Sequence, residues 1–243
     1  MSLPPKPWPT GTVEQIEPMV ARVLAPNGSP FTFTGTQTYL VGTAAGLAVI
    51  DPGPDDPDHL AALIAAIGTA PVLAICCTHT PRDHSPAAAP LSALTGAPIV
   101  GCAPLVIESD APRVDAPFDK AYAPDRVLAD GESLTGPGWT LTALATPGHT
   151  SNHLCYALEE TGALFTGDHV MAWSTSVVVP PDGDMADYMA SLERLYDRPD
   201  RIYYPAHGPA VEKPRQLVRG MIGHRRAREN QIVKLLQVVI PHE

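Results

Sequence analysis

Four short apolar runs in this chain each end in a turn that is followed by His or Asp. The first run, 72–77, leads into the cluster His79-Thr80-Pro81-Arg82-Asp83-His84. The other runs, 139–145, 163–167 and 202–205, lead through small residues to His149, Asp168 and His207. Short apolar runs bounded by turn residues predict buried strands. A fold in which several strands deliver such side chains can aim them all at one point.

Imidazole and carboxylate groups together suit a divalent metal of the zinc type. A single His after a strand is weak support for a metal site, because such residues are more often part of a loop or of the core. Four such placements in one chain are strong support, since chance would scatter them over helices and termini. Pro81 cannot coordinate a metal, and it stiffens the loop where a third histidine would lie.

The order of these motifs resembles the metallo-β-lactamase superfamily. The matching segments are HTPRDH at 79–84, TPGHT at 146–150, FTGD at 165–168 and PAHG at 205–208, with IDPG at 50–53 as the structural turn. Within the superfamily, three further segments are similar to the β-lactamase-like protein 2 group: GTQTYL at 35–40, STSVVVPPDGD at 174–184 and HRRARE at 224–229. The resemblance implies a four-layer αββα sandwich with a metal site at one edge.

The sequence departs from the pattern of this group at three places: position 81, position 37 and the C-terminus. Pro81 replaces the second histidine of the first cluster, and Gln37 stands where the group usually has Asn. The sequence stops at Glu243, where relatives continue into a small winged-helix-like domain. We therefore expect a single metallo-β-lactamase-like domain over 1–243 without that addition, with a proline-rich segment at 1–30 wrapping its surface and a C-terminal helix at 214–238.

The resemblance implies two metal sites in one cleft. The second site would comprise Asp83, His84 and His207, with Asp168 reaching between the metals. The first would comprise His79, His149, Asp168 and position 81, so that Pro81 leaves it two histidines and the shared carboxylate. We expect zinc, one or two ions per chain, with the second site filled in preference to the first.

Asp83 is the expected catalytic residue, since it would position the attacking water as well as bind metal. A bound metal lowers the pKa of water from 15.7 to about 7. His153 and His169 are assigned to the support of the ligands in preference to contact with substrate, and His153 is also an alternative ligand in place of position 81. Asp51 is assigned to a structural turn.

These residues predict a metal-dependent hydrolase. By resemblance its substrate is a phosphodiester of single-stranded RNA, and a small-molecule thioester or lactam is the alternative. A non-catalytic binding homologue with impaired metal binding stays open because of Pro81. The arginines at 215, 219, 225, 226 and 228 could contact phosphate, but a solvated helix face with Glu229 as partner is favoured. Trp173 and the loop 174–181 are assigned to the surface in preference to the cleft.

Composition restricts the functional classes. With 44% hydrophobic and 17% charged residues the chain is an ordinary globular protein, and its net charge of −10 argues against a broad polyanion-binding surface. The four cysteines have no metal-type spacing and predict reduced buried thiols. We find no signal-peptide pattern and no long apolar span, so we expect a cytoplasmic protein without a membrane segment. Nothing in the sequence indicates the oligomeric state.

Periodicity and turn signals place the remaining elements. We expect strands at 36–42, 46–51, 97–101 and 153–158, and helices at 58–67, 86–94 and 185–196.

Overall fold

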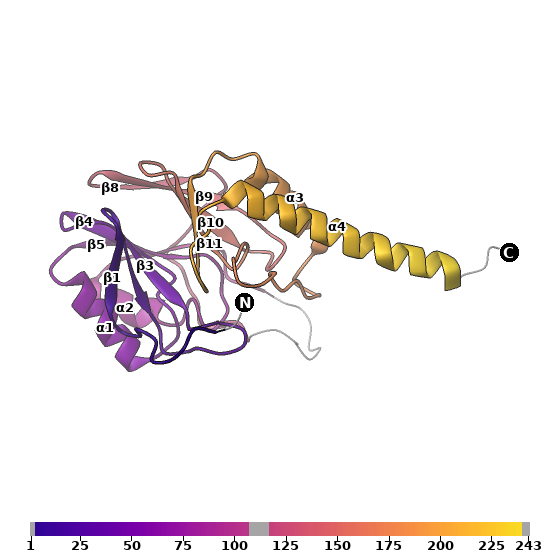
Figure 1. Ribbon diagram of the computed structural model, residues 1–243. Coiled ribbons are helices and arrows are strands. Elements are labelled where there is room, and N and C mark those ends of the chain that lie inside the picture. Colours follow the sequence, from indigo (N-terminus) through magenta and orange to yellow (C-terminus); the bar gives the residue numbers. More distant parts are fainter. Residues whose placement is uncertain (1–2, 107–116, 240–243) are drawn as a thin grey trace.

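The computed structural model describes residues 3–106 and 117–239. Two sheets face each other, and helices cover their outer sides (Figure 1). The first sheet runs in the order β1 (Val13–Glu17), β2 (Val20–Leu24), β3 (Gln37–Thr43), β4 (Gly46–Ile50), β5 (Val72–Cys77), β6 (Ile99–Gly101) and β7 (Arg126–Val127). The second runs β12 (Ile202–Pro205), β11 (Ala163–Gly167), β10 (Leu154–Leu158), β9 (Trp139–Ala145) and β8 (Ser133–Gly136).

Both sheets are mixed. In the first, the pairs from β1 to β4 are antiparallel and those from β4 to β7 are parallel. In the second, β11 and β12 pair in parallel, while the pairs from β8 to β11 are antiparallel. The parallel pairs need crossover connections, and the helices supply most of them.

The main core lies between the two sheets. Tyr39 of β3 packs on Phe165 of β11 with ring centroids 5.0 Å apart. Trp139 is buried and donates a hydrogen bond from Nε1 to the Gly46 carbonyl at 3.0 Å, so it joins β9 to β4. This hydrogen bond satisfies the indole N–H of Trp139, while the ring contributes apolar area to the core.

Helices form the outer layers. α1 (Pro57–Ile67) and α2 (Ala88–Thr95) cover the first sheet, while α3 (Met185–Tyr196) and α4 (Pro214–Val239) cover the second (Figure 1). Asp56 caps α1 by accepting from the His59 N–H at 2.8 Å, and Pro57 pre-sets the first turn. A second core cluster that includes Leu164, Leu192 and Val218 joins α3 and α4 to the sheet. The predicted αββα sandwich is therefore confirmed.

The N-terminal segment differs from its prediction. Residues 13–24 form β1 and β2 instead of wrapping the surface, and Val20 and Val23 are fully buried. The prolines of 4–9 dominate the composition there, but the short run at 20–24 lies beyond them and pairs with β3. The helix expected at 214–238 spans Pro214–Val239, and its second half extends away from the body (Figure 1). No helix among the described residues is long and apolar enough to cross a membrane.

Candidate metal centre

The ends of four strands bring the predicted residues together at one edge of the sandwich. His79, Asp83 and His84 follow β5, His149 follows β9, Asp168 follows β11 and His207 follows β12. Among the described residues, three groups have ligand atoms within 4.8 Å of one another, and one of them is Asp51 with His79 and His84. The other two consist of predicted ligands: His79 with His149 and Asp168, and Asp83 with His84 and His207. We call these the first and second ligand groups.

Backbone hydrogen bonds hold the two sheets together at this edge. The Leu154 N–H donates to the Thr78 carbonyl at 2.8 Å, and the Gln37 N–H donates to the Ala206 carbonyl at the same distance. The buried Gln37 side chain also donates from Nε2 to the carbonyls of Gly208, at 2.6 Å, and Pro205, at 3.2 Å. Gln37 therefore fixes the turn that presents His207.

Asp168 lies against both ligand groups. Its carboxylate oxygens are 3.7 Å from His84 Nε2, 3.9 Å from His149 Nε2 and 3.4 Å from His207 Nε2. Asp83 Oδ2 is 3.1 Å from His207 Nε2 and 3.4 Å from His84 Nε2. Asp168 therefore lies between the two groups and is close to histidines of both.

Several polar atoms of the cluster are buried without a hydrogen-bond partner among the described residues. They are Nε2 of His79, His84 and His207 and Oδ1 of Asp168. Burying unpaired polar atoms is costly, and native proteins pair nearly all of them. A cation held between these atoms would remove that cost, so the residues present fit a divalent metal.

The other ring nitrogen of each histidine is held by a neighbour, which turns Nε2 toward the centre. The Nδ1 contacts are Thr78 Oγ1 at 2.9 Å for His79, Asp51 Oδ2 at 3.0 Å for His84, the Val177 carbonyl at 2.6 Å for His149 and the Gly35 carbonyl at 3.3 Å for His207.

Asp51 has a larger role than the turn predicted for it. Its buried carboxylate accepts from the Thr78 N–H and from Thr78 Oγ1, both at 2.8 Å, and contacts His84 Nδ1. Its φ of 49° lies in the left-handed region, which Asp tolerates better than most residues. The Ile50-Asp51-Pro52-Gly53 motif was the available signal, but the sequence did not show that His84 lies beside it.

His153 and His169 do not line the cleft. His153 is buried, and its ring nitrogens meet Thr146 Oγ1 at 2.9 Å and the Asp168 N–H at 3.3 Å. Both ring nitrogens of His153 therefore contact protein groups, and one of them holds the backbone of Asp168. His169 is buried against Tyr188, with ring centroids 4.8 Å apart.

Burial and charge set the protonation forms of the cluster. Burial, together with the neighbouring His84, holds the pKa of His79 well below its ordinary value. Burial opposes ionisation of Asp168, but the imidazoles of His207 and His84 overcome it and lower the pKa of that carboxyl. Burial lowers the pKa of His84 and His207, but the carboxylates of Asp83 and Asp168 outweigh it and raise the pKa of both rings. Metals bind ionised carboxylates and neutral imidazoles, so a bound metal would displace the protons of these two rings.

Pro81 lies inside the loop that carries His79, Asp83 and His84. It is buried, its carbonyl accepts from the His84 N–H at 3.0 Å, and its backbone bridges to Phe118. The loop therefore keeps His79, Asp83 and His84 in the cluster although position 81 offers no ligand atom.

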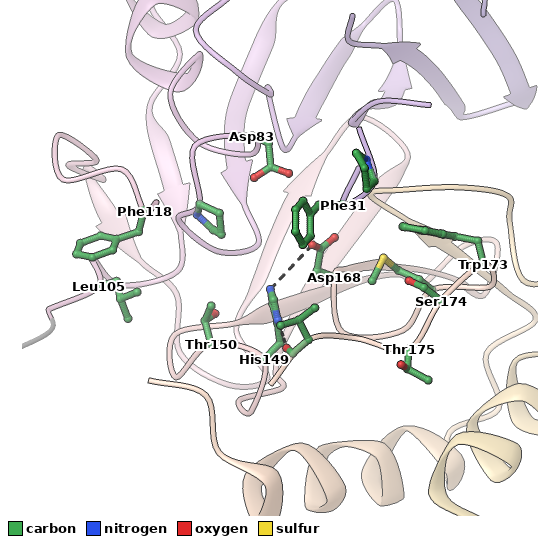
Figure 2. Close-up of a pocket in the computed structure, with 14 residues that line it drawn as sticks. Phe31, Asp83, Leu105, Phe118, His149, Thr150, Asp168, Trp173, Ser174 and Thr175 are labelled. Atoms are coloured by element: carbon green, nitrogen blue, oxygen red, sulfur yellow. Dashed lines mark hydrogen bonds and ion pairs between the residues drawn. The ribbon is translucent and has the colours of Figure 1, made fainter. Parts of the chain in front are cut away.

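A cavity of about 300 Å³ opens onto the cluster (Figure 2). Figure 2 shows Leu105 and Phe118 on one side of it and Trp173, Ser174 and Thr175 on the other. The described lining comprises Pro30, Phe31, Pro81, Asp83, Leu105, Phe118, His149, Thr150, Asp168, Met171, Trp173, Ser174, Thr175 and Val177. The assignment of Trp173 and the loop after it to a plain surface position is therefore wrong, because Trp173 and residues 174, 175 and 177 form a wall of the cavity.

Three arginines of α4 contact residues outside that helix. Arg226 pairs with Glu193 of α3 at 2.6 Å, in place of the predicted Glu229. Arg215 lies over the Tyr196 ring at 4.7 Å, and Arg225 donates from Nη2 to the Ser176 carbonyl at 2.6 Å.

A family model described as the metallo-beta-lactamase superfamily matches residues 31–207. The chain belongs to this superfamily. It is 32% identical over 237 residues to an atrochrysone carboxyl ACP thioesterase of Cryptosporiopsis sp. (strain 8999), covering 97% of this chain and 68% of the relative. It is 33% identical over 235 residues to a beta-lactamase-like protein 2 homolog of Caenorhabditis elegans, covering 93% and 73%.

Solved structures give the same fold. A metallo-beta-lactamase family protein from Thermus thermophilus superposes with a TM-score of 0.73 at 23% identity, covering 92% of this chain and 84% of that one. The resemblance to the superfamily and to the β-lactamase-like protein 2 group is confirmed. The superfamily consists mainly of metal-dependent hydrolases.

Proposed function

We propose that this protein is a metal-dependent hydrolase of thioesters that carry a bulky apolar acyl group. The observation that carries the proposal is the cavity, whose walls are largely apolar where it meets the ligand cluster. Phe31, Phe118 and Trp173 offer flat apolar surfaces around a floor that holds Asp83 and Asp168. Pockets of this kind bind apolar groups and orient them with a few polar atoms.

The same lining argues against the phosphodiester of RNA. Among the described residues that line the cavity, the charged groups are the carboxylates of Asp83 and Asp168. RNA-binding sites need cationic groups for the phosphates, and the net charge of −10 adds a long-range repulsion. RNA remains the second candidate substrate, because one relative is a beta-lactamase-like protein 2 homolog. Another relative is named as an ACP thioesterase, which supports the thioester substrate.

The proposed ligands are those of the two ligand groups. Asp83, His84 and His207 would hold one metal, His79 and His149 the other, and Asp168 would contact both. The second group has three protein ligands besides Asp168, whereas Pro81 leaves the first with only two, so we propose that the second group binds more tightly. Zinc suits this donor set, and iron also accepts imidazole and carboxylate ligands.

A bound divalent metal would supply a water that ionises near neutral pH and a Lewis acid for the substrate's carbonyl oxygen. Asp83 lies on the cavity wall, where its carboxylate can orient that water and accept a proton from it. The water oxygen forms a bond to the acyl carbon and the carbon–sulfur bond breaks. The sulfur leaves as thiolate and takes up the proton that Asp83 accepted from the water. The acid product loses its own proton to solvent, so the products are a free thiol and a carboxylate.

The test compares benzoyl and acetyl thioesters of N-acetylcysteamine by thiol release, beside a fluorescently labelled single-stranded RNA. We expect kcat/KM for the benzoyl thioester to exceed that for the acetyl thioester by at least about tenfold, because the larger group fills the apolar cavity. Trp173→Ala should reduce this preference. Trp8→Ala, which removes an indole outside the cavity, should not.

Other outcomes would replace the proposal. Chelator-sensitive RNA cleavage without thioester turnover would assign the phosphodiester substrate. Absence of turnover on both substrates by fully metal-loaded protein would favour the non-catalytic homologue.

A further inference from the structure

The segment HRRARE of α4 contains an arginine that contacts the loop after Trp173. Arg225 donates from Nη2 to the carbonyl of Ser176 at 2.6 Å, and its guanidinium lies 5.5 Å from the centre of the Tyr188 ring. Its Nε is buried. Arg226, the next residue, is exposed and pairs with Glu193 on the outer face of α3. The two arginines therefore have different surroundings on the same helix turn.

Ser176 belongs to the loop that orients a proposed ligand. The carbonyl of the next residue, Val177, accepts from His149 Nδ1 at 2.6 Å. Ser176 Oγ donates to the His169 carbonyl at 2.8 Å, and Tyr188 Oη donates to the same carbonyl at 3.1 Å. Arg225, Ser176 and His149 are thus linked through one short stretch of backbone.

We infer that Arg225 is a positioning residue for His149. By fixing the Ser176 carbonyl it fixes the Val177 carbonyl, which holds the His149 ring in the Nδ1–H tautomer with Nε2 turned to Asp168. The inference rests on the proposed ligand groups, and it does not depend on which substrate is hydrolysed.

Loss of Arg225 should lower the metal affinity of the first ligand group and leave that of the second group nearly unchanged. His84 and His207 are oriented by Asp51 and the Gly35 carbonyl, which belong to loops of the first sheet, whereas α4 covers the second. The first group has the smaller set of protein ligands because position 81 is Pro, so it depends more on the orientation of those that remain. Residues that orient ligands are typically worth about 10–100-fold in metal affinity.

The test measures zinc binding by competition with a chromogenic chelator for the wild type, Arg225→Ala, Arg225→Lys and Arg226→Ala. In Arg225→Ala we expect the weaker zinc to lose about tenfold in affinity, and the tighter zinc to change by less than about twofold. Arg225→Lys retains a cationic donor and should recover part of the loss. Arg226→Ala is the matched control and should behave as the wild type.

A second readout needs no metal. In the metal-free protein, nitrogen-15 NMR of the His149 ring, assigned with His149→Gln, should show the Nδ1–H tautomer in the wild type and in Arg226→Ala. In Arg225→Ala it should show a mixture of tautomers. The inference is overturned when the ring keeps its tautomer in Arg225→Ala, or when both zinc ions weaken equally. Failure of the proposed function would look different, since it would appear in the wild type as absent turnover.

Discussion

Position 81 decides how many ligands the first group has. The proline ring is buried beside the cavity, and the carbonyl of that residue helps to close the turn that carries His84. The loop therefore retains its shape although one side chain lacks a donor atom. A missing ligand in an otherwise preserved loop predicts lower affinity at one metal without loss of the fold.

Restoring the histidine should raise that affinity. For Pro81→His we expect the weaker zinc to bind at least about tenfold more tightly, since an imidazole would join His79 and His149. Zinc content after dialysis and competition with a chelator would measure the change. Pro81→Ala is the control, because it removes the proline restraint on φ without adding a ligand, and it should leave the affinity near that of the wild type. An equal gain in zinc affinity in Pro81→His and Pro81→Ala would contradict the prediction. It would show that removing the proline restraint on the loop, and not adding an imidazole, raises the affinity.

At the scale of elements, α1 is joined to β3 by a buried histidine. His59 is fully buried, and its Nε2 lies 3.0 Å from Thr38 Oγ1. Burial lowers the pKa of His59 from 6.5 to about 4, although Asp56 opposes the shift. The folded protein therefore resists protonation of this imidazole, because the charged ring would be buried away from water.

This shift predicts a pH dependence of stability. Between pH 4 and 6.5 the unfolded chain binds a proton at His59 that the folded chain does not, so stability falls as the pH falls through this window. The free energy of unfolding should fall by about 3 kcal/mol across this window, which corresponds to the full shift of the His59 pKa. Urea unfolding at several pH values should give a flatter profile for His59→Gln than for the wild type. His224→Gln, on an exposed helix face, should keep the wild-type profile. Parallel profiles for the wild type and His59→Gln would contradict the prediction.

At the scale of the whole molecule, the ligand cluster lies where the two sheets meet. Ligands after β5 come from the first sheet, and those after β9, β11 and β12 come from the second (Figure 1). A metal held by both sets would join the two halves of the sandwich. Removing it would leave unpaired buried nitrogens where the two sheets meet.

Metal removal should therefore lower the melting temperature. A ligand at one hundred times its Kd stabilises the folded state by about 2.7 kcal/mol, which corresponds to about 5–10 °C for a chain of this size. Differential scanning calorimetry before and after chelation, followed by zinc addition, would measure the change. A variant with Asp168→Asn and His207→Gln should show a much smaller response to zinc. Identical melting temperatures with and without metal in the wild type would contradict the proposed centre.

The sandwich could be predicted because the order of the motifs resembles the metallo-β-lactamase superfamily, and the residues of the cluster could be predicted from the strand ends that carry them. Strands such as 139–145 and 163–167 are readable because apolar periodicity and turn residues act over a few neighbours. The same local signals marked His79, Asp83, His84, His149, Asp168 and His207 as residues delivered by strand ends. They also marked Pro81 as a position without a ligand atom.

The surroundings of those residues could not be predicted from the sequence. Asp51 beside His84, Val177 beside His149 and Arg225 beside Ser176 are contacts between segments far apart in the chain, and no local pattern encodes them. The cavity could not be predicted from local patterns either, because its apolar wall combines Phe31, Phe118 and Trp173 from three separate loops. Substrate preference depends on that wall, because packing between distant segments sets its shape and polarity.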